Sequence, residues 1–513
     1  MLSSTLLAIA IIAPQDLAAI EKTLVRAVDK ATYEAGAYQA ARQLSEMRSV
    51  EAMEVRLELF DDKLNSYRGV FLRDWFFSGM LKAESKEELS LVAEAAADKK
   101  NSTLLRWVCL RALATAKAPV ALKPLLDKSL TKCKDQDLKY QWQRTLGTLH
   151  AKNLLDFDGF RGREPQARVL ADLNVAPGLG LAQLAGSESD FTATVIGMAL
   201  SAKDPGSRAE LLRLLGQNQA INGESLRPLL LSSLSLGKPA DWNCALRAAA
   251  IDVIAERKFA MLIPEIIKSL AAETAQGGGR FAVDYGNLMM DLTGLRIGRN
   301  PDIWQRWWDN EGEQWLKDGA STPRANQQRT EHEQDTVASM FGVPVDSKRL
   351  VIALDGSGSM NDSMGDTTCL QAARREITIL LDRLPNDAMF DLVVVEKELI
   401  SSFGKLVKNT DKNRKKALAL LERRSFRSTS SLYDALRDIQ REWGADTILL
   451  IGDGGSSSGT HQYPGHMLSG LETEYSRSGV RIHTVCTTSN NTKLRFMRKL
   501  AAISGGTMVQ PPG

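Results

Sequence analysis

The chain of 513 residues has no large excess of charge of either sign, because its formal net charge is +3. It also lacks a dense run of Lys and Arg that would supply a local phosphate-binding stripe. We therefore expect no nucleic-acid partner and no electrostatic binding to a membrane surface. No stretch approaches the roughly 18 consecutive apolar residues of a bilayer-spanning helix, so we expect no integral membrane span.

Cysteine is scarce, and its five copies are far apart in the sequence. They form no C-x-x-C pair, which argues against a structural zinc site. The odd number leaves at least one thiol unpaired within a monomer, and we expect buried free thiols. The cysteines are Cys109, Cys133, Cys244, Cys369 and Cys486.

The N-terminal residues MLSSTLLAIAIIAP are strongly apolar and carry no charged side chain. Their length suits the apolar core of a secretory signal and is too short for a bilayer span. Ala8 and Ala10 provide a small-x-small cleavage pattern, so we expect residues 1–13 to be a signal peptide of an exported (periplasmic or secreted) protein. No Lys or Arg precedes the apolar run, and the alternative is a cytoplasmic protein in which Leu6–Ile12 begins a buried helix.

Residues 14–316 carry an all-α pattern, with apolar side chains recurring every three or four residues. In 104–126 and 245–267, an Ala-rich helix is expected to lead into a helix with Pro in its first turn, and 211–230 hints at a third pair. Such pairs resemble HEAT-type helical repeats, which stack so that each unit buries its neighbour's apolar face. The resemblance implies an array with a concave surface for a second protein partner. The alternative is an ordinary globular helical domain.

The segment that closes this helical region is rich in tryptophan. Asn300 and Pro301 are favourable as the N-cap and the first residue of a helix. On that helix, one face carries Trp304, Trp307, Trp308 and Trp315. We expect this face to pack in the core of the last repeat, with a platform for a sugar or a peptide as the alternative.

A chain of this length is too long for one hydrophobic core and is expected to hold about three domains. Residues 317–347 are polar and have no sustained apolar period. We therefore predict an interdomain linker there, with one short helix around 336–341.

After residue 347, short apolar runs rich in β-branched residues alternate with helical patterns. This alternation predicts an α/β domain with a parallel, doubly wound, Rossmann-like sheet. Ligands of such sheets bind beyond the carboxyl ends of the strands, where Asp355 and Asp453 lie. The expected strands are 349–354, 389–395, 447–451, 481–486 and 507–510, and the expected helices are 370–384, 413–421, 432–443 and 494–503.

The residues at that edge have the chemistry of a site for a hard cation. Asp355, Ser357 and Ser359 alternate in a tight, glycine-containing turn, so their oxygens can converge on one point. Asp453, which follows a neighbouring strand, adds a second carboxylate. Carboxylate and hydroxyl oxygens, with no Cys or His required, suit Mg²⁺ or Mn²⁺ in octahedral geometry.

The sequence around these residues resembles the von Willebrand factor type A domain over 348–513. VIALDGSGSM matches the D-x-S-x-S signature of the family's metal-ion-dependent adhesion site. STSSLYDAL resembles the second loop, usually Gly-Gly-Thr before x-Leu-Tyr-Asp-Ala-Leu, and LLIGDGG resembles the third, usually Thr-Asp-Gly. LRFMRKLAAISGGTMV resembles the family's last helix and strand.

The resemblance implies that an ion is held at the family's metal positions. In this chain they are occupied by Asp355, Ser357, Ser359, Ser430 and Asp453. Ser430 stands at the family's threonine position, with Thr429 beside it as the alternative source of the hydroxyl. Gly452 replaces the Thr or Ser that usually precedes the third-loop Asp, which removes a hydroxyl near the ion and is expected to tune the metal affinity.

In the family, the ion keeps one coordination position for a Glu or Asp carboxylate of a partner protein, so binding needs a divalent cation and is lost on chelation. The resemblance therefore implies a non-enzymatic protein-binding function that depends on Mg²⁺ or Mn²⁺. His461, Tyr463 and His466 follow Asp453 in the third loop. We expect them on the ligand-binding rim, with a solvated loop as the alternative.

Two other functions are compatible with parts of the sequence. In the first, the metal only stabilises the fold, and the helical repeats bind the partner. In the second, the protein is a hydrolase, because Gly455–Gly459 matches G-x-S-x-G with Ser457 as the nucleophile. The residues after Ser457, through Gly465, do not form the helix that a nucleophile elbow requires. The sequence also lacks H-E-x-x-H and G-x-x-x-x-G-K-[ST], which counts against a metalloprotease and a P-loop ATPase.

Overall fold

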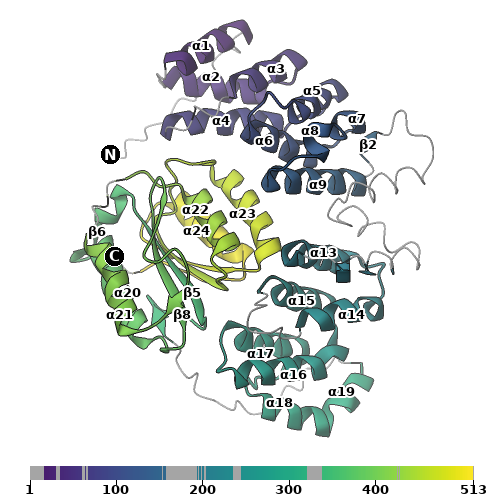
Figure 1. Ribbon diagram of the computed structural model, residues 1–513, viewed down its shortest axis with the longest axis vertical. Helices are drawn as coiled ribbons and strands as arrows, with labels where there is room; N and C mark the ends of the chain where they lie inside the picture. The colour runs from purple at the N-terminus through teal and green to yellow at the C-terminus, as the bar shows by residue number, and fades with distance from the viewer. Residues whose placement is uncertain are drawn as a thin grey trace, which may run out of the picture. The chain divides into compact units, whose positions relative to one another are not determined.

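The chain divides into two compact units, residues 1–166 and 167–513, whose elements are labelled in Figure 1. The expected signal peptide, residues 1–13, lies outside the residues that the structure describes. Among the described residues, no helix combines the length and the apolar character needed to cross a membrane. The structure, a computed structural model, describes residues 17–30, 35–60, 64, 67–152, 154–156, 193, 196–197, 199–201, 204–234, 244–319, 338–423, 426 and 428–511.

The first unit consists mainly of helices that pack against their neighbours in the sequence. Its elements are α1 (Leu17–Lys30), α2 (Ala35–Glu46), α3 (Val50–Leu59), α4 (Tyr67–Met80), α5 (Lys86–Ala97), α6 (Thr103–Ala114), β1 (Val120–Ala121), α7 (Leu122–Leu125), α8 (Lys128–Thr131), α9 (Gln136–Ala151) and β2 (Leu155–Asp156). Of the helix pair expected in 104–126, the first helix is α6 and the second is reduced to the four residues of α7. Pro119 does not begin that second helix, because Val120 belongs to β1 and pairs in parallel with Leu155 of β2.

Residues 204–234 and 244–319 form the described helical part of the second unit. Its elements are α13 (Pro205–Gln217), α14 (Gly223–Leu234), α15 (Cys244–Arg257), α16 (Ile263–Ala275), α17 (Arg280–Thr293), α18 (Pro301–Trp307) and α19 (Glu313–Lys317). The pair α15 and α16 has the expected arrangement, with Pro264 at the start of α16. In α14 the expectation is wrong, because Pro228 lies inside the helix rather than in its first turn. The helical region predicted for 14–316 is therefore divided between two units.

The tryptophan-rich end of this part belongs to the core, as expected. Asn300 is the N-cap of α18 and accepts two backbone N–H groups. The buried rings of Trp304 and Trp307 meet edge to face, with centroids 5.8 Å apart. Trp308 and Trp315 are partly buried against the same cluster. These rings therefore stabilise the last helices rather than forming an open platform.

The α/β domain begins before the boundary predicted from the sequence. Residues 338–347, expected to be part of a linker, contain a hairpin whose Met340 is fully buried in the core of this domain. Over the described residues, the short helix expected at 336–341 is wrong. Phe341 and Gly342 have φ values of 48° and 82°, which turn the chain back on itself between two strands. The hairpin strands are β3 (Ser339–Met340) and β4 (Val343–Pro344).

The sheet of this domain has a parallel centre, as predicted, with antiparallel strands added at one edge. Strands β8, β5, β11, β12 and β13 pair in parallel in this order, and β9 and β10 pair with β8 in the antiparallel sense. Helices α20 and α21 cover one face, and α22, α23 and α24 cover the other (Figure 1). The bounds are β5 (Arg349–Asp355), β6 (Ser363–Met364), β7 (Thr367–Thr368), α20 (Cys369–Arg383), β8 (Met389–Val395), β9 (Leu399–Ser401), β10 (Val407–Lys408), α21 (Asp411–Glu422), α22 (Leu432–Glu442), β11 (Thr447–Gly452), α23 (Pro464–Ser478), β12 (Arg481–Cys486), α24 (Asn491–Ile503) and β13 (Met508–Val509).

Strands β5 and β11 are neighbours at the point where the sheet changes its winding direction. From β5 the chain crosses to β8 on one side and later enters β11 on the other side. Leu354 of β5 lies opposite Ile451 of β11. Because the two strands are parallel, their carboxyl ends meet at the same edge, which is where ligands of doubly wound sheets bind. This register brings Asp355 and Asp453 to one place.

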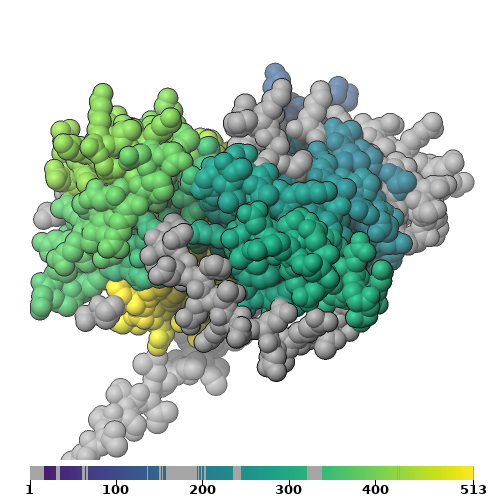
Figure 2. All heavy atoms as spheres, turned by 90° about the horizontal axis from the view of Figure 1, so that it is seen from below, coloured from purple at the N-terminus to yellow at the C-terminus, as the bar shows by residue number. Residues whose placement is uncertain are grey.

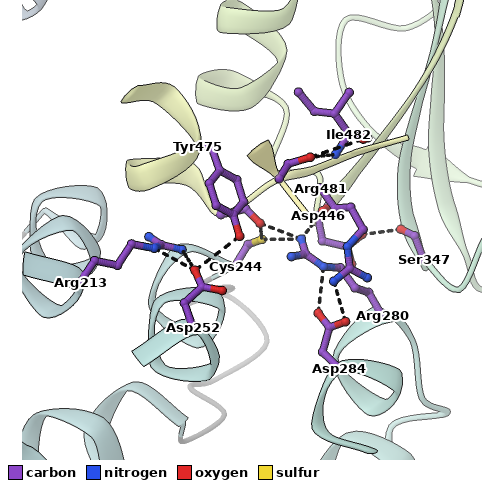
Figure 3. A network of polar contacts seen from close by, with 12 residues as sticks. Arg213, Cys244, Asp252, Arg280, Asp284, Ser347, Asp446, Tyr475, Arg481 and Ile482 are labelled. Atoms are coloured by element: carbon purple, nitrogen blue, oxygen red, sulfur yellow. Dashed lines mark hydrogen bonds and ion pairs between the residues drawn. The ribbon is translucent and has the colours of Figure 1, made fainter. Parts of the chain in front are cut away.

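At the opposite edge, the amino ends of β11 and β12 are held by a buried arginine of the helical part. Arg280, at the start of α17, is 3% exposed and donates hydrogen bonds to the carbonyl oxygens of Asp446 and Gly479, at 2.5 and 2.7 Å. It also pairs with Asp284, whose other carboxylate oxygen accepts an N–H of Arg481 at 2.7 Å. Figure 3 shows both guanidinium groups converging on this carboxylate. The helical part and the sheet therefore share one polar network.

A second group of contacts joins α13 and α15 to α23. Arg213 pairs with Asp252 at 2.8 Å and donates a hydrogen bond to the carbonyl oxygen of Ser476 at 2.5 Å. Its guanidinium lies over the ring of Tyr475. Figure 2 shows the helical part and the α/β domain side by side. These contacts lie at the end of α23 and at the amino ends of the strands, at the opposite edge of the sheet from Asp355 and Asp453.

Removing the Arg280 guanidinium is expected to destabilise the second unit. The Arg280→Met substitution keeps a long side chain but removes the guanidinium donor from two carbonyl oxygens and from one oxygen of Asp284. Breaking a buried ion pair in this way costs about 3–5 kcal/mol. The free energy of unfolding, measured by urea denaturation with tryptophan fluorescence, should fall by that amount. Lys317→Met, which breaks the exposed pair with Glu313, is the control and should leave it unchanged. An Arg280→Met protein as stable as wild type would contradict this role.

Candidate metal centre

Asp355 and two serines form a hydrogen-bonded turn at the end of β5. The backbone N–H of Ser357 donates to Oδ1 of Asp355 at 2.9 Å, and its hydroxyl donates to Oδ2 at 2.9 Å. The Oγ atoms of Ser357 and Ser359 lie 2.8 Å apart. The structure therefore brings together the three side chains that the sequence singled out in this turn.

Asp453 provides a second carboxylate from the end of β11 and is 5% exposed. Its Oδ1 accepts the backbone N–H of Gly455 at 2.7 Å, and its Oδ2 accepts Nζ of Lys493 at 2.5 Å. The residue before it, Gly452, lies so close to Asp355 that an added Cβ would be 2.5 Å from the Cβ of Asp355. A glycine, in place of the family's Thr or Ser, therefore permits the close approach of the two strand ends.

The two carboxylates differ in how strongly they hold a proton. Burial, reinforced by the charge of Asp453, raises the pKa of Asp355 to about 7. Burial would raise the pKa of Asp453 as well, but hydrogen bonds from Lys493 and from the N–H of Gly455 hold it below its usual value. A hydrogen bond from Ser359 lowers it further. When both carboxylates are ionised, the buried pair carries more negative charge than the one ammonium group of Lys493 balances, which a bound cation would relieve.

The donor atoms of this turn and loop fit a hard divalent cation. Asp355, Ser357, Ser359 and Asp453 supply carboxylate and hydroxyl oxygens, the ligand types that suit Mg²⁺ and Mn²⁺. In the part of the chain that the structure describes, no group of three or more His, Cys, Asp and Glu side chains is placed to hold a metal ion. A site here would therefore depend on serine hydroxyls as well as on the two carboxylates.

The second loop reaches the site through Ser430. This residue is 2% exposed, and its hydroxyl donates to the carbonyl oxygen of Gly455 at 3.0 Å. Its backbone N–H donates to Oγ of Ser457 at 2.9 Å. Thr429, the alternative, is exposed. The structure thus places Ser430 against the third loop, beside Gly455, whose backbone N–H donates to Asp453.

Of the three residues expected on the ligand-binding rim, only Tyr463 is exposed. His461 and His466 are 2% and 6% exposed, so the expectation that they lie on the rim is wrong. Their rings lie 5.7 Å apart, and His461 also packs against Tyr433 at 5.0 Å. Helix α23 begins at Pro464, and His466 lies on the buried side of that helix. Tyr463 is 47% exposed and can contact a partner.

Ser457, the alternative nucleophile, belongs to the contact between the second and third loops. Its hydroxyl accepts the N–H of Ser430, and its own N–H donates to the carbonyl oxygen of Ser430 at 2.8 Å. The next helix begins only at Pro464. Ser457 therefore does not stand on the strand–turn–helix elbow that presents a nucleophilic serine.

Lys493 is a residue of the site that the sequence reasoning missed. It lies in the first turn of α24, three residues after the N-cap Asn490. A positive side chain in the first turn opposes the helix dipole, so it is unfavourable without a nearby anion. That local conflict is the signal that could have pointed to Lys493.

The raised pKa of Asp355 makes the metal-free protein less stable as the pH rises. From the unfolded value of about 4 to the folded value of about 7, the native state binds more protons than the unfolded chain, so the stability that protonation supplies at low pH is lost across this window. Asp355→Asn removes the titrating group. In chelator, the free energy of unfolding of wild type should fall by on the order of a few kcal/mol, relative to that of this variant, as the pH rises from about 4 to about 7. Thermal unfolding at stepped pH measures this, and parallel profiles would contradict it.

No protein-family model and no curated protein sequence matches the chain. Among solved structures, it is similar to a von Willebrand factor type A protein from Catenulispora acidiphila, with 19% identity and a TM-score of 0.28 over 33% of this chain and 39% of that chain. Proximal thread matrix protein 1 from the mussel byssus matches with 19% identity and a TM-score of 0.25, over 32% of this chain and 41% of that one. The matched region therefore spans less than half of either protein. Similarity at this level carries no argument about the site, which rests on the strand order and the contacts described above.

Proposed function

We propose that the C-terminal part of the chain is a von Willebrand factor type A-like domain that binds a partner protein through a Mg²⁺ or Mn²⁺ ion. The proposed ligands are Asp355, Ser357, Ser359, Ser430 and Asp453. The observation that carries the proposal is the meeting of Asp355 and Asp453 at the carboxyl ends of β5 and β11, with the serine hydroxyls beside them. The type A resemblance of the sequence names the same residues in the same order.

The ion, when bound, would accept a carboxylate oxygen from a Glu or Asp of the partner. The chain's own residues orient the ligands, because Ser357 holds both oxygens of Asp355. Ser357 and Ser359 are half-buried and Gly358 between them is exposed, so a partner can reach this turn from solvent. We infer binding rather than catalysis, because Ser457 is engaged by Ser430 and is not presented as a nucleophile.

A structural role for the metal is the second candidate. It is favoured by the burial of both carboxylates, each only 5% exposed, because a buried ion can serve the fold without a partner. In that case the helical region binds the partner. The two candidates differ in what the loss of the ion does to binding, and this difference can be measured.

Mg²⁺ binding should depend on Asp355. In calorimetric titration of the chelator-treated full chain, we expect saturable binding by wild type and none by Asp355→Asn, because the variant loses the charge of a central ligand. The matched control is Asp411→Asn, which neutralises an exposed aspartate at the start of α21 and should bind as wild type does. Failure of the folded wild type to bind Mg²⁺ or Mn²⁺, or equal binding by Asp355→Asn, would refute the proposed site.

Partner capture should require both the ion and Asp355. Tagged wild type and Asp411→Asn are expected to retain a partner from cell extract in Mg²⁺ and to release it in chelator, whereas folded Asp355→Asn retains nothing. Quantitative mass spectrometry of the eluates measures the difference. If Asp355→Asn and chelator-treated wild type keep the partner but melt at a lower temperature, the metal is structural and the binding surface lies elsewhere.

A further inference from the structure

Lys493 brings a positive charge into the candidate metal centre. Its Nζ lies 2.5 Å from Oδ2 of Asp453. The side chain of Asp453 is 7% exposed, whereas that of Lys493 is 39% exposed. The ammonium group therefore reaches from the surface to a buried carboxylate that is also a proposed metal ligand.

The third loop is built so that the first turns of α24 can come this close. Gly454 has a φ of 74°, and an added Cβ would lie 2.8 Å from Cγ of Met497. An added Cβ at Gly455 would lie 2.9 Å from Oδ1 of Asp453 and 3.1 Å from Nζ of Lys493. Gly455 thus keeps free the space in which the ion pair forms, and Gly454 lets Met497 of α24 approach the loop. The pair also offsets the unfavourable position of Lys493 in the first turn of a helix.

The positive charge of Lys493 has opposite effects on the site with and without a bound metal ion. Without a metal, Lys493 balances one of the two carboxylates. With a divalent ion bound to Asp355 and Asp453, the same ammonium group would lie a few ångströms from a charge of the same sign. Coulomb repulsion at this range is substantial even with solvent screening.

We propose that Lys493 competes with the metal ion for Asp453. It neutralises Asp453 in the metal-free domain and weakens the binding of Mg²⁺. The inference rests on the proposed metal site and adds a residue that sets its affinity. It also gives Lys493 a role that differs between the two states, because the ion pair stabilises the metal-free domain and opposes the metal-bound one.

Neutral and charged substitutions of Lys493 separate this role from simple packing. In calorimetric titration of the chelator-treated full chain, Lys493→Gln should bind Mg²⁺ about tenfold more tightly than wild type, the effect expected of one unit charge on a dication across a few screened ångströms. Lys493→Arg keeps the charge and should bind as wild type does. Lys493→Ala is a second neutral variant and should match Lys493→Gln. Added salt should narrow the difference in Mg²⁺ affinity between wild type and the neutral variants.

The effect of Mg²⁺ on the melting temperature distinguishes the proposed role of Lys493 from a packing role. In chelator, Lys493→Gln should melt at a lower temperature than wild type, because Asp453 loses its counter-ion, and saturating Mg²⁺ should remove this difference. A lysine needed only for packing would lower the melting temperature equally in both conditions.

The outcomes distinguish this inference from the metal site on which it rests. Tighter binding by the neutral variants than by wild type supports both. Equal or weaker binding by the neutral variants overturns the role of Lys493 and leaves the metal site in place. No binding by any folded protein overturns the metal site and the inference together.

Discussion

The parallel pairing of β5 with β11 is the constraint on which the candidate site depends. Its register places Leu354 opposite Ile451, so both strands end together and deliver a carboxylate to the same point. Gly452 makes the approach closer than a residue with a Cβ would allow. Two buried carboxylates at short range are unfavourable, and the raised pKa of Asp355 is the consequence. Burial of the strands' apolar side chains holds this arrangement in place.

The other ends of the same strands are held by a different interaction. The carbonyl oxygen of Asp446, immediately before β11, accepts a hydrogen bond from Arg280. The carboxylate of Asp446 accepts one from the hydroxyl of Ser347 at 2.5 Å. Arg481 at the start of β12 shares Asp284 with Arg280. A buried guanidinium from the helical part therefore satisfies backbone groups that a free sheet edge would leave to water. The helical part therefore supports the amino edge of the sheet, which is opposite the edge where Asp355 and Asp453 lie.

The sequence predicts the centre of this domain well, and for a physical reason. Strands covered on both faces are mostly apolar, so 349–354 and 447–451 are recognised to within one residue of the bounds that the structure has. The hairpin at 338–347 is missed, because it depends on a positive φ at Phe341, a conformation that a bulky residue rarely adopts. Arg280 is missed because nothing near it in the sequence separates a buried arginine from one on the surface. His461 and His466 show the same limit, since their place in the chain does not tell which side of the loop they face.

The residues of the site divide in the same way between those that the sequence reveals and those that need the fold. Asp355, Ser357 and Ser359 are recognisable because a tight turn brings alternate residues together, whatever surrounds them. Lys493 comes from helix α24 and meets Asp453 where Gly455 leaves room for its ammonium group. Local sequence can therefore identify the atoms that would bind a cation. The affinity for the cation depends also on charged groups that only the tertiary structure brings near these atoms. The ion pair of Lys493 and Asp453 is therefore as much a part of the proposed site as the ligands themselves.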